Sequence, residues 1–478
     1  MSLWTSDAIA KATNGTVTGA FTVEGVSIDS RTVAAGDLFI ALVGPTHDGH
    51  AHVAQALAAG AAGALVHSLP EGVDRDRLIL VDDTFDALND LGRAGRDRFS
   101  GKVVGVTGSV GKTSTKEMLA LVLAAFGPTH AAVGSFNNHW GVPLTLARMP
   151  ADAAFAVIEM GMNHAGEITP LAKLARPHVA VITTIAPVHI EFFDGIEGIA
   201  DAKAEIFAGC EDWATAVLPR DSAQYDRLAH AAHARGLTVL PFGEHAEAGS
   251  RLLDASVEAE RTLIFAIIGG HKVTYSIGAS GRHWASNSLA VLGACHALGL
   301  PVDEAARPLA TMTPPKGRGA RRRVSLPAER GEGSILVVDE SYNASPTAVA
   351  AALAALAAVE PGKRGRRIAV LGDMLELGRS GPDLHAGLAE PVQRHGIDLV
   401  YTAGPLMAHL REALPPHLRG GGHAPDSQAL APVVAAAVRG GDVVMVKGSA
   451  GSRMGRVVEA LLTLDQTPDP AKGRGEGH

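Results

Sequence analysis

The stretch "VVGVTGSVGKTSTKEMLALVL", residues 103–123, constrains the fold more than any other part of the chain. Its opening residues, Val103 to Val106, are mostly β-branched and predict a buried strand. Lys116 onward predicts a helix with one apolar face, and a glycine-rich turn separates the two elements. Because strands and helices in this alternation build parallel sheets, we expect an α/β fold with this turn at the carboxyl edge of a sheet.

The turn has the residue types that hold phosphate groups. The common G-x-x-x-x-G-K-[ST] pattern would place its first glycine at position 106, which is a valine here. Glycines still allow close approach to backbone N–H groups, Lys112 can reach the outer phosphates and the Thr113 hydroxyl can bind Mg²⁺. An ordinary βα turn with a solvated lysine is the alternative. We predict a nucleotide-phosphate site formed by Gly108, Ser109, Val110, Gly111, Lys112, Thr113 and Ser114.

Short continuous apolar runs recur along the chain and divide it into three α/β blocks, as expected for parallel strands covered on both faces. We predict domains at residues 1–98, 99–314 and 315–464, followed by a mobile tail at 465–478. "TPPKGRGARRRVS" marks the joint between the second and third domains, and Gly269-Gly270 marks a hairpin. The expected strands lie in "DLFIALVG", "GALVHS", "RLILVDD", "KVVGVTG", "FAVIEMG", "VAVITTI", "ILVVDESYN", "RIAVLGDM", "DLVYTAG" and "DVVMVKGS".

Composition excludes several classes of protein. A net charge of −8 gives no support to nucleic-acid binding, and no apolar run approaches the ~18 residues of a membrane span. The first residues lack the basic and apolar regions of a signal peptide, so we expect a cytoplasmic protein, and a monomer. Cys210 and Cys295 form no C-x-x-C pair, which predicts two buried thiols rather than a disulfide framework or zinc site.

Several motifs together resemble one family. "TGSVGKTS" is similar to the ATP loop of the Mur ligases and their folylpolyglutamate synthase relatives. Further family motifs follow in the same order: "SFNNHWGVPLTL", "EMGMNHAGEI", "TTIAPVHIEFFDG", "AKAEIF", "GRHWASNSLA", "DESYNASPTAV", "LGDMLELG" and "VKGSAGSRM". The resemblance covers the chain except its tail. It implies a three-domain architecture with a central P-loop ATPase-like parallel sheet and a Rossmann-like C-terminal domain.

Within the family, "EMGMNHAGEI", "DESYNASP" and "GDMLELG" resemble the members that join D-alanyl-D-alanine to a UDP-N-acetylmuramoyl tripeptide. The leading block "SIDSRTVAAGDLFIALVGPTHDGH" is similar to the uridine-nucleotide domain that folylpolyglutamate synthases lack. The implied activity is an ATP-dependent peptide ligation of peptidoglycan precursor synthesis through an acyl phosphate. Another Mur-type ligase, a folylpolyglutamate synthase and an ATP-binding switch without ligase activity are the alternatives. The third residue of the acceptor peptide is not set by these motifs.

Three residues are candidates for metal binding beside Thr113. Glu159 ends a buried strand, where a carboxylate either binds Mg²⁺ or caps the next helix. His189 also follows a strand and by itself is more typical of a structural histidine, but the resemblance implies a second Mg²⁺. Lys203 would otherwise be a solvated helical lysine. The resemblance implies that CO₂ carbamylates it into an anionic ligand, and that Lys112, His189 and Lys203 are the catalytic residues.

The remaining candidates are polar residues at turns and strand ends. Asn137 and Asn138 offer amide groups to a sugar or peptide, or form a turn. His283 and Asn287 match the family's nucleotide-base segment, but Trp284 stands where the family commonly has Asn, so stacking or Asn287 alone would contact the base. Arg318 could reach the γ-phosphate, whereas Arg321 to Arg323 read as a solvated linker. The strand-end group Asp339, Tyr342 and Asn343 could face ATP, with the Asp339 carboxylate accepting from ribose hydroxyls.

Two further groups are assigned to the substrates. By resemblance, Asp373, His385, Lys447 and Ser449 surround the incoming dipeptide and the peptide carboxylate. In the first block, hydroxyl, guanidinium and turn groups could bind uridine diphosphate, although Asp48-Gly49 could simply form a tight turn. The candidates there are Ser30, Arg31, Asp48, Gly49 and His50.

Overall fold

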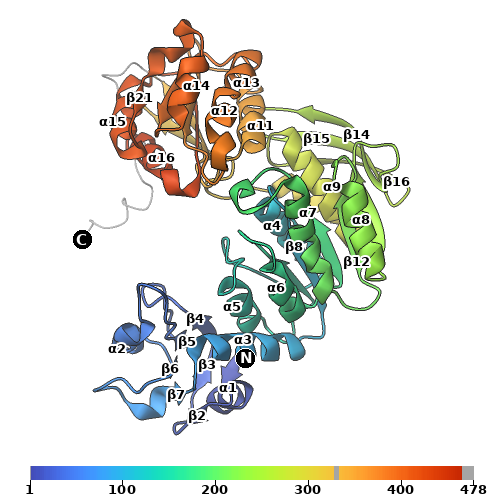
Figure 1. Ribbon diagram of the computed structural model, residues 1–478, viewed down its shortest axis with the longest axis vertical. Coiled ribbons are helices and arrows are strands. Elements are labelled where there is room, and N and C mark those ends of the chain that lie inside the picture. The colour runs from blue at the N-terminus through green and yellow to red at the C-terminus, as the bar shows by residue number, and fades with distance from the viewer. Residues whose placement is uncertain (1, 328–332, 466–478) are drawn as a thin grey trace, which may run out of the picture.

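The computed structural model describes residues 2–327 and 333–465. Within these residues the strands form three larger sheets and a two-stranded one, β1 (Trp4–Thr5) with β3 (Thr22–Val23). Figure 1 shows the sheets in three units along an arc, with the N-terminal unit in blue, the central unit in green and yellow and the C-terminal unit in orange and red. The α/β architecture with parallel sheets is confirmed. Apart from Asp465, the predicted tail lies outside the described residues.

The N-terminal sheet has the order β2-β7-β6-β5-β4, and its last four strands are parallel. Its helices are α1 (Ser6–Thr13), α2 (Val53–Ala58) and α3 (Thr84–Asp97). Helix α3 begins where the Asp83 carboxylate accepts the N–H groups of Phe85 and Asp86. The strands are β2 (Thr16–Val17), β4 (Gly25–Ser27), β5 (Asp37–Ile40), β6 (Gly63–Val66) and β7 (Leu78–Leu80).

The central sheet has the order β16-β15-β14-β13-β12-β11-β8-β10-β9. Pairing is parallel from β9 to β14, and β14, β15 and β16 are antiparallel, with the predicted hairpin turning at Gly269-Gly270. Both of these glycines have positive φ. The strands are β8 (Lys102–Thr107), β9 (Thr129–Ala131), β10 (Phe155–Glu159), β11 (Val179–Ile182), β12 (Thr215–Pro219), β13 (Thr238–Gly243), β14 (Ser250–Val257), β15 (Thr262–Ile268) and β16 (His271–Ile277).

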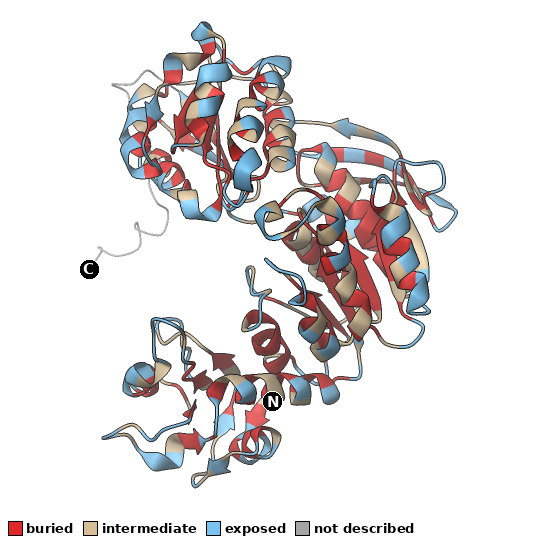
Figure 2. Ribbon diagram, viewed as in Figure 1, coloured by how far each residue is buried: buried red, intermediate tan, exposed pale blue. Residues whose placement is uncertain are grey.

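Helices cover both faces of this sheet, as Figure 2 shows by the buried strands between them. Val104 and Val106 of β8 pack with one helix layer, whereas Val103 packs with the other, as expected for a parallel core. The first layer is α4 (Lys112–Leu123), α9 (Arg282–Ala297) and α10 (Val302–Ala306). The second is α5 (Gly141–Ala147), α6 (Ile168–Ala175), α7 (Ile196–Ala204) and α8 (Tyr225–Ala234).

The C-terminal sheet has the order β17-β18-β22-β19-β20-β21. Arg321 to Arg323 are not a linker, because they belong to β17, which pairs antiparallel with β18 at the sheet edge, but Arg322 and Arg323 are solvent-exposed as predicted. The strands are β17 (Ala320–Ser325), β18 (Ser334–Glu340), β19 (Arg367–Gly372), β20 (Leu399–Ala403), β21 (His423–Ala424) and β22 (Val443–Lys447). The helices are α11 (Pro346–Ala357), α12 (Gly381–Ala386), α13 (Ala389–Arg394), α14 (Met407–Ala413), α15 (Ser427–Ala437) and α16 (Gly455–Leu462).

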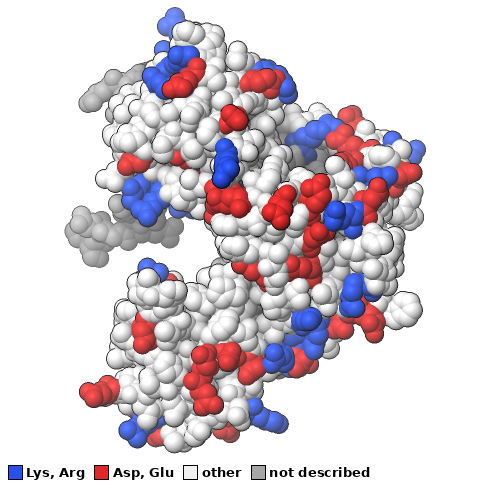
Figure 3. Space-filling view, in the orientation of Figure 1, with Lys and Arg blue, Asp and Glu red and all other residues white. Residues whose placement is uncertain are grey.

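The N-terminal unit is attached to the central one through α3 and α5. A Cβ at Gly95 of α3 would lie 2.2 Å from the carbonyl oxygen of Leu146, so the small residue permits this close contact. The Trp4 indole also donates to the Ala147 carbonyl at 2.8 Å. Figure 3 shows the surface hollowed between the N-terminal and C-terminal units, on the side opposite the bulk of the central unit.

Two further predictions concern the cysteines and membrane-spanning segments. Cys210 and Cys295 are both buried with free thiols, as predicted. Burial raises the pKa of each thiol to about 12. Among the described residues, no helix has the length and hydropathy needed to cross a membrane.

Candidate active site

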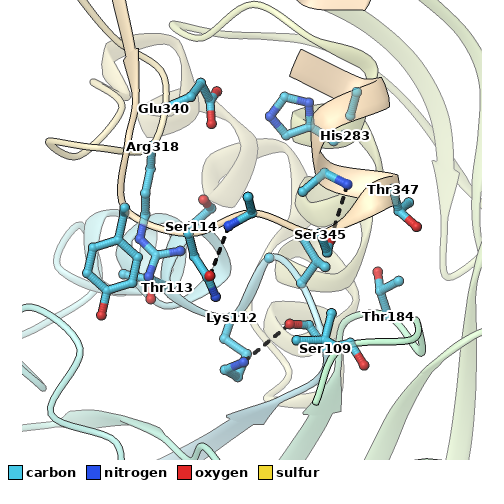
Figure 4. A pocket seen from close by; sticks show the side chains of 18 of the residues that line it. Ser109, Lys112, Thr113, Ser114, Thr184, His283, Arg318, Glu340, Ser345 and Thr347 are labelled. Atoms are coloured by element: carbon cyan, nitrogen blue, oxygen red, sulfur yellow. Dashed lines mark hydrogen bonds between the residues drawn. The ribbon is translucent and has the colours of Figure 1, made fainter. Parts of the chain in front are cut away.

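A cavity of about 310 Å³ lies where the central and C-terminal units meet. The central unit contributes the turn before α4, the end of β10 and residues of α9, and the C-terminal unit contributes the segment after β18 and the start of α11. Figure 4 shows Lys112 and Ser109 on one side of the cavity and Arg318 and Glu340 on another. The sequence-predicted residues that line it are Ser109, Val110, Gly111, Lys112, Thr113, Ser114, Asn137, Glu159, His189, His283, Asn287, Arg318, Tyr342, Asn343 and Lys447.

The turn before α4 requires its two glycines. Gly108 has φ 142° and Gly111 has φ 90°, a region that L side chains rarely adopt. A Cβ at Gly108 would lie 2.1 Å from Thr183 Oγ1, and one at Gly111 would lie 2.8 Å from Asn287 Oδ1. The helix begins at Lys112, four residues earlier than the sequence predicted, so its first N–H groups belong to the turn. This is the geometry of an anion site at a helix N-terminus.

Lys112 folds back over this turn. Its Nζ donates to the Gly108 carbonyl at 2.8 Å and more weakly to the Ser109 carbonyl at 3.4 Å. Burial lowers the pKa of Lys112, while the nearby Glu159 carboxylate opposes that shift. Two carbonyls compensate a half-buried ammonium only partly, so an anionic phosphate would be a better partner.

Thr113, Asn137 and Glu159 form a polar cluster at the end of β10. Glu159 is 1% exposed, and its Oε1 accepts from Thr113 Oγ1 at 3.0 Å and from Asn137 Nδ2 at 2.7 Å. Its Oε2 is buried and has no hydrogen-bond partner among the described residues. An unpaired buried carboxylate oxygen beside a threonine hydroxyl suits a hard divalent cation.

The donor set resembles a Mg²⁺ site rather than a closed metal cage. Across residues 2–327 and 333–465, no group of three or more His, Cys, Asp or Glu side chains is placed to hold an ion. Mg²⁺ commonly binds through one or two protein oxygens and completes its shell with water and substrate phosphates. The Thr113 and Glu159 pair therefore fits Mg²⁺ bound together with a nucleotide.

His189 lies at the contact between the central and C-terminal units. Its backbone is left-handed, with φ 59°, and its Nδ1 is hydrogen-bonded to the carboxylate of Glu376. Burial lowers the pKa of His189, and the Glu376 carboxylate opposes that shift. The sequence did not single out Glu376, although it lies in the quoted motif "LGDMLELG".

Lys203 is 2% exposed on α7 and does not line the cavity directly. Burial lowers its pKa well below the usual range, and the positive charge of Lys112 adds to this shift. None of the described residues forms a hydrogen bond or ion pair with its amine. This burial excludes the solvated helical lysine that was the alternative.

Arg318 reaches the phosphate side of the cavity from the joint between the units. Its guanidinium lies over the Tyr342 ring, 4.1 Å from the centroid, and donates to Ser135 Oγ at 3.2 Å. Ser135 Oγ is also 3.4 Å from Thr113 Oγ1. Sequence reasoning missed Ser135, which lies two residues before Asn137 in the same quoted motif.

Of the three residues predicted near the nucleotide base, two line the cavity and one lies in the core. His283 and Asn287 line the cavity, and burial lowers the pKa of His283. Trp284 is 1% exposed within the hydrophobic core, so the structure does not support stacking of its ring on a base. On the opposite side, α11 presents small residues to the cavity, namely Thr347, Ala348, Ala351 and Ala352.

Asp339 and Glu340 end β18, and only the second lines the cavity. Asp339 Oδ2 accepts the Gly317 N–H at 3.0 Å, and its Oδ1 accepts the Ser341 hydroxyl at 2.6 Å. These contacts fix the segment that joins the central and C-terminal units. The contact between Asp339 and a ribose stays a prediction. Glu340, which the sequence did not single out, pairs with Lys447 Nζ at 3.2 Å inside the cavity.

A second cavity of about 300 Å³ lies at the carboxyl edge of β19 and β20. Asp373 lines it and accepts the Met407 N–H at 2.8 Å. Four charged side chains surround this cavity, and the last three were not predicted: Asp373, Asp426, Arg453 and Arg456.

Two residues assigned to the dipeptide have internal roles. His385 is 0% exposed, with Nε2 accepting the Met374 N–H and Nδ1 bonded to the Gly381 carbonyl, so its ring lines neither cavity and its contact with the substrate stays a prediction. Ser449 Oγ accepts the Leu375 N–H at 2.9 Å, lies at the carboxyl edge of β22 and lines neither cavity.

Asn138 and the N-terminal candidates lie outside both cavities. Asn138 Oδ1 accepts the N–H groups of Trp140 and Gly141, which is the turn role that was its alternative. In the N-terminal unit, Asp48 forms a local turn with the His50 N–H and ring, and Arg31 pairs with Asp29. Gly49 packs on the Ala41 backbone, and Ser30 lies beside Arg31.

Comparison with known proteins defines the class. Models of the Mur ligase family match in order: the family's catalytic domain at residues 22–91, the middle domain at 106–295 and the glutamate ligase domain at 322–450. The UDP-N-acetylmuramoyl-tripeptide–D-alanyl-D-alanine ligase of Bacillus subtilis is 34% identical, over 92% of this chain and 93% of its own length. The chain therefore belongs to the Mur ligase family.

Solved structures give the same result for the fold. The crystal structure I of MurF from Acinetobacter baumannii has a TM-score of 0.81 at 27% identity, covering 96% of this chain and 99% of the other. The MurF ligase of Thermotoga maritima in complex with ADP has a TM-score of 0.75 at 30% identity, covering 92% and 97%. The three-domain prediction from sequence motifs is thus confirmed at the level of architecture.

Proposed function

We propose that this protein joins D-alanyl-D-alanine to a UDP-N-acetylmuramoyl tripeptide, using ATP, in peptidoglycan precursor synthesis in the cytoplasm. The observation that carries the proposal is the cluster of Lys112, Thr113 and Glu159 facing Arg318 across one cavity. The names of the similar ligases support the choice of substrates.

The reaction needs two displacements. An oxygen of the substrate carboxylate attacks the γ-phosphorus of ATP, the bond to the β-phosphate oxygen breaks, and ADP leaves. The neutral amine of the dipeptide then attacks the acyl carbon, the carbon–oxygen bond to phosphate breaks, and inorganic phosphate leaves as the attacking nitrogen loses one proton and keeps the other as the amide N–H. A ligase site must therefore hold both ends close together and exclude water.

The phosphate groups would lie on the turn from Gly108 to Ser114. Lys112 would exchange its two carbonyl partners for phosphate oxygens, and Arg318 would approach the γ-phosphate from the joint. His283 and Asn287 would lie beside the base, with Tyr342, Asn343 and Asp339 on the ribose side. The small residues of α11 leave room for the base against that helix.

Thr113 and Glu159 would hold one Mg²⁺, and His189 with Lys203 would hold a second. The ions would neutralise the charge that develops on the transferred phosphoryl group. Lys203, buried and without a partner among the described residues, is proposed to carry a carbamate formed with CO₂. Asn137 would keep Glu159 oriented through its 2.7 Å hydrogen bond.

The dipeptide would bind in the second cavity as a zwitterion. The guanidinium groups of Arg453 and Arg456 suit the carboxylate of the dipeptide. The two cavities are connected along the chain, because Asp373 and Leu375 line the second cavity and the next residue, Glu376, contacts His189 of the first. Lys447 would lie beside the peptide carboxylate in the first cavity. The uridine diphosphate would bind the N-terminal unit near Ser30, Arg31, Asp48, Gly49 and His50.

The experiment that tests this function is phosphate release with exchanged acceptors. With ATP, Mg²⁺ and the UDP-muramoyl tripeptide, we expect release only when D-alanyl-D-alanine is added, with the pentapeptide as the product by mass. Release with single amino acids would instead indicate another Mur-type ligase, and release with a folate and glutamate would indicate a folylpolyglutamate synthase. ATP binding without release under any condition would indicate a switch.

A further inference from the structure

Lys116 is a fully buried charge that has no role in the proposed reaction. It lies on α4, one turn after Lys112, and is 0% exposed. Its Nζ donates to the carbonyls of Ala132 at 2.6 Å and Gly134 at 2.8 Å, and it pairs with Glu117 at 2.8 Å. An ammonium has three donors, so these contacts use all of them. A buried charge is tolerated only with such partners.

The two carbonyls belong to the loop, residues 132–140, that joins β9 to α5. The apolar side chains near its tip point outward, since Val133 is 66% exposed and Phe136 is 40% exposed. Gly134, with φ 58°, turns the chain at this point. Burial of apolar side chains therefore does not fix the tip of the loop, and polar contacts from α4 take that role.

The same loop carries two side chains that enter the candidate active site. Ser135, next to Gly134, lies 3.4 Å from Thr113 Oγ1 and accepts a hydrogen bond from Arg318 of the joint. Asn137 donates to Glu159 Oε1, and its carbonyl accepts the Gly161 N–H. The loop thus connects the phosphate-binding turn, the carboxylate at the end of β10 and the arginine that reaches in from the C-terminal unit.

We propose that Lys116 is a positioning residue, which fixes the backbone of residues 132–134 so that Ser135 and Asn137 meet Thr113, Arg318 and Glu159. The proposal rests on the proposed function and extends it to a residue that touches no substrate. Lys116 holds the backbone of the loop at Ala132 and Gly134, and the loop holds the side chains that orient the phosphate site. Loss of the ammonium loosens the tip, because the anchor that then remains before Ser135 is the long hydrogen bond, 3.4 Å, from the Ala132 N–H to the Val157 carbonyl.

The test is Lys116→Met, which keeps the length of the side chain and removes its charge and donors. Lys173→Met is the matched control, since Lys173 is exposed on α6. Hydrogen exchange of the protein without substrates should increase for residues 132–137 in Lys116→Met and stay unchanged in β8 and α9. Displacement of reacting groups by about 1 Å can cost about 10²-fold, so we expect kcat to fall about 10- to 100-fold, with KM for the dipeptide within about twofold.

Two results would overturn the proposal. One is unchanged exchange at residues 132–137 together with a kcat within about twofold of the wild type. The other is increased exchange throughout the central unit, with activity lost in proportion to the folded fraction, because Lys116 would then only stabilise the core. Lys116→Gln is measured in the same way where the methionine variant does not fold. Exchange needs no turnover, so a wild type without ligase activity would refute the function and leave this test intact.

Discussion

At the scale of residues, Lys112 combines burial with a weak set of partners. Its ammonium is held by two carbonyls of its own turn, and burial lowers its pKa. A phosphate would replace these partners with a full opposite charge, and the exchange requires only that the side chain swing outward. The Lys112 ammonium therefore lies close to the position at which it would contact a bound phosphate.

Lys112→Ala should remove a charge that the transition state needs and keep the fold, because both hydrogen bonds of the side chain are with its own turn. We expect kcat to fall by about 10²–10³-fold, the effect of removing one preorganised donor. Phosphate release measures the loss, and a thermal melt serves as the folding control. Full turnover by this variant would disprove the assignment of the turn to ATP.

Sequence reasoning found the site residues that follow a strand and missed those whose roles depend on the fold. Lys112, Thr113 and Glu159 could be predicted because the carboxyl ends of parallel strands meet at one edge. Ser135 and Glu376 could not, because each meets its partner only through contacts between distant segments. His385 was placed in the site by motif alone, and the structure assigns its ring to the interior.

At the scale of elements, strands were predictable from continuous β-branched runs, and the edge strand β17 was not. Its three arginines suggested a solvated linker, but an edge strand buries little and tolerates charge. Only Val324 of this segment is fully buried, so the strand is stabilised mainly by its pairing with β18, which the composition does not reveal.

Two histidines, the half-buried His178 and the buried His385, connect elements by accepting backbone N–H groups. His178, before β11, accepts from Val103 of β8 at 3.1 Å, and His385 of α12 accepts from Met374 at 2.9 Å. Both acceptor nitrogens must be unprotonated for these bonds. Burial lowers the pKa of each histidine below the usual 6.5.

These histidines make stability dependent on pH in a defined direction. The unfolded chain binds protons near pH 6.5 where the folded chain does not, so the free energy of unfolding should fall as the pH drops below about 6.5. Urea unfolding at pH 7.5 and 5.5 measures this change. The difference should shrink in His385→Gln and persist in His230→Gln, whose side chain is exposed on α8. An equal pH effect in both variants would exclude His385 as a source.

At the scale of the whole molecule, contacts between units place the chemistry. Arg318 reaches Ser135, and Glu376 of the C-terminal unit contacts His189 of the central one. Helix α3 fixes the N-terminal unit against α5, which follows the loop carrying Asn137. The apolar runs and the family motifs predicted the three units, but only the structure shows which residues meet between them.

In the proposed reaction, the substrate carboxylate is activated as an acyl phosphate in the cavity between the units. The most direct measurement uses a UDP-muramoyl tripeptide with oxygen-18 in the carboxylate that is joined, together with ATP, Mg²⁺ and D-alanyl-D-alanine. We expect each released phosphate to carry one labelled oxygen, because that oxygen leaves with phosphorus when the amide forms. Phosphate without label, released while the pentapeptide accumulates, would contradict it.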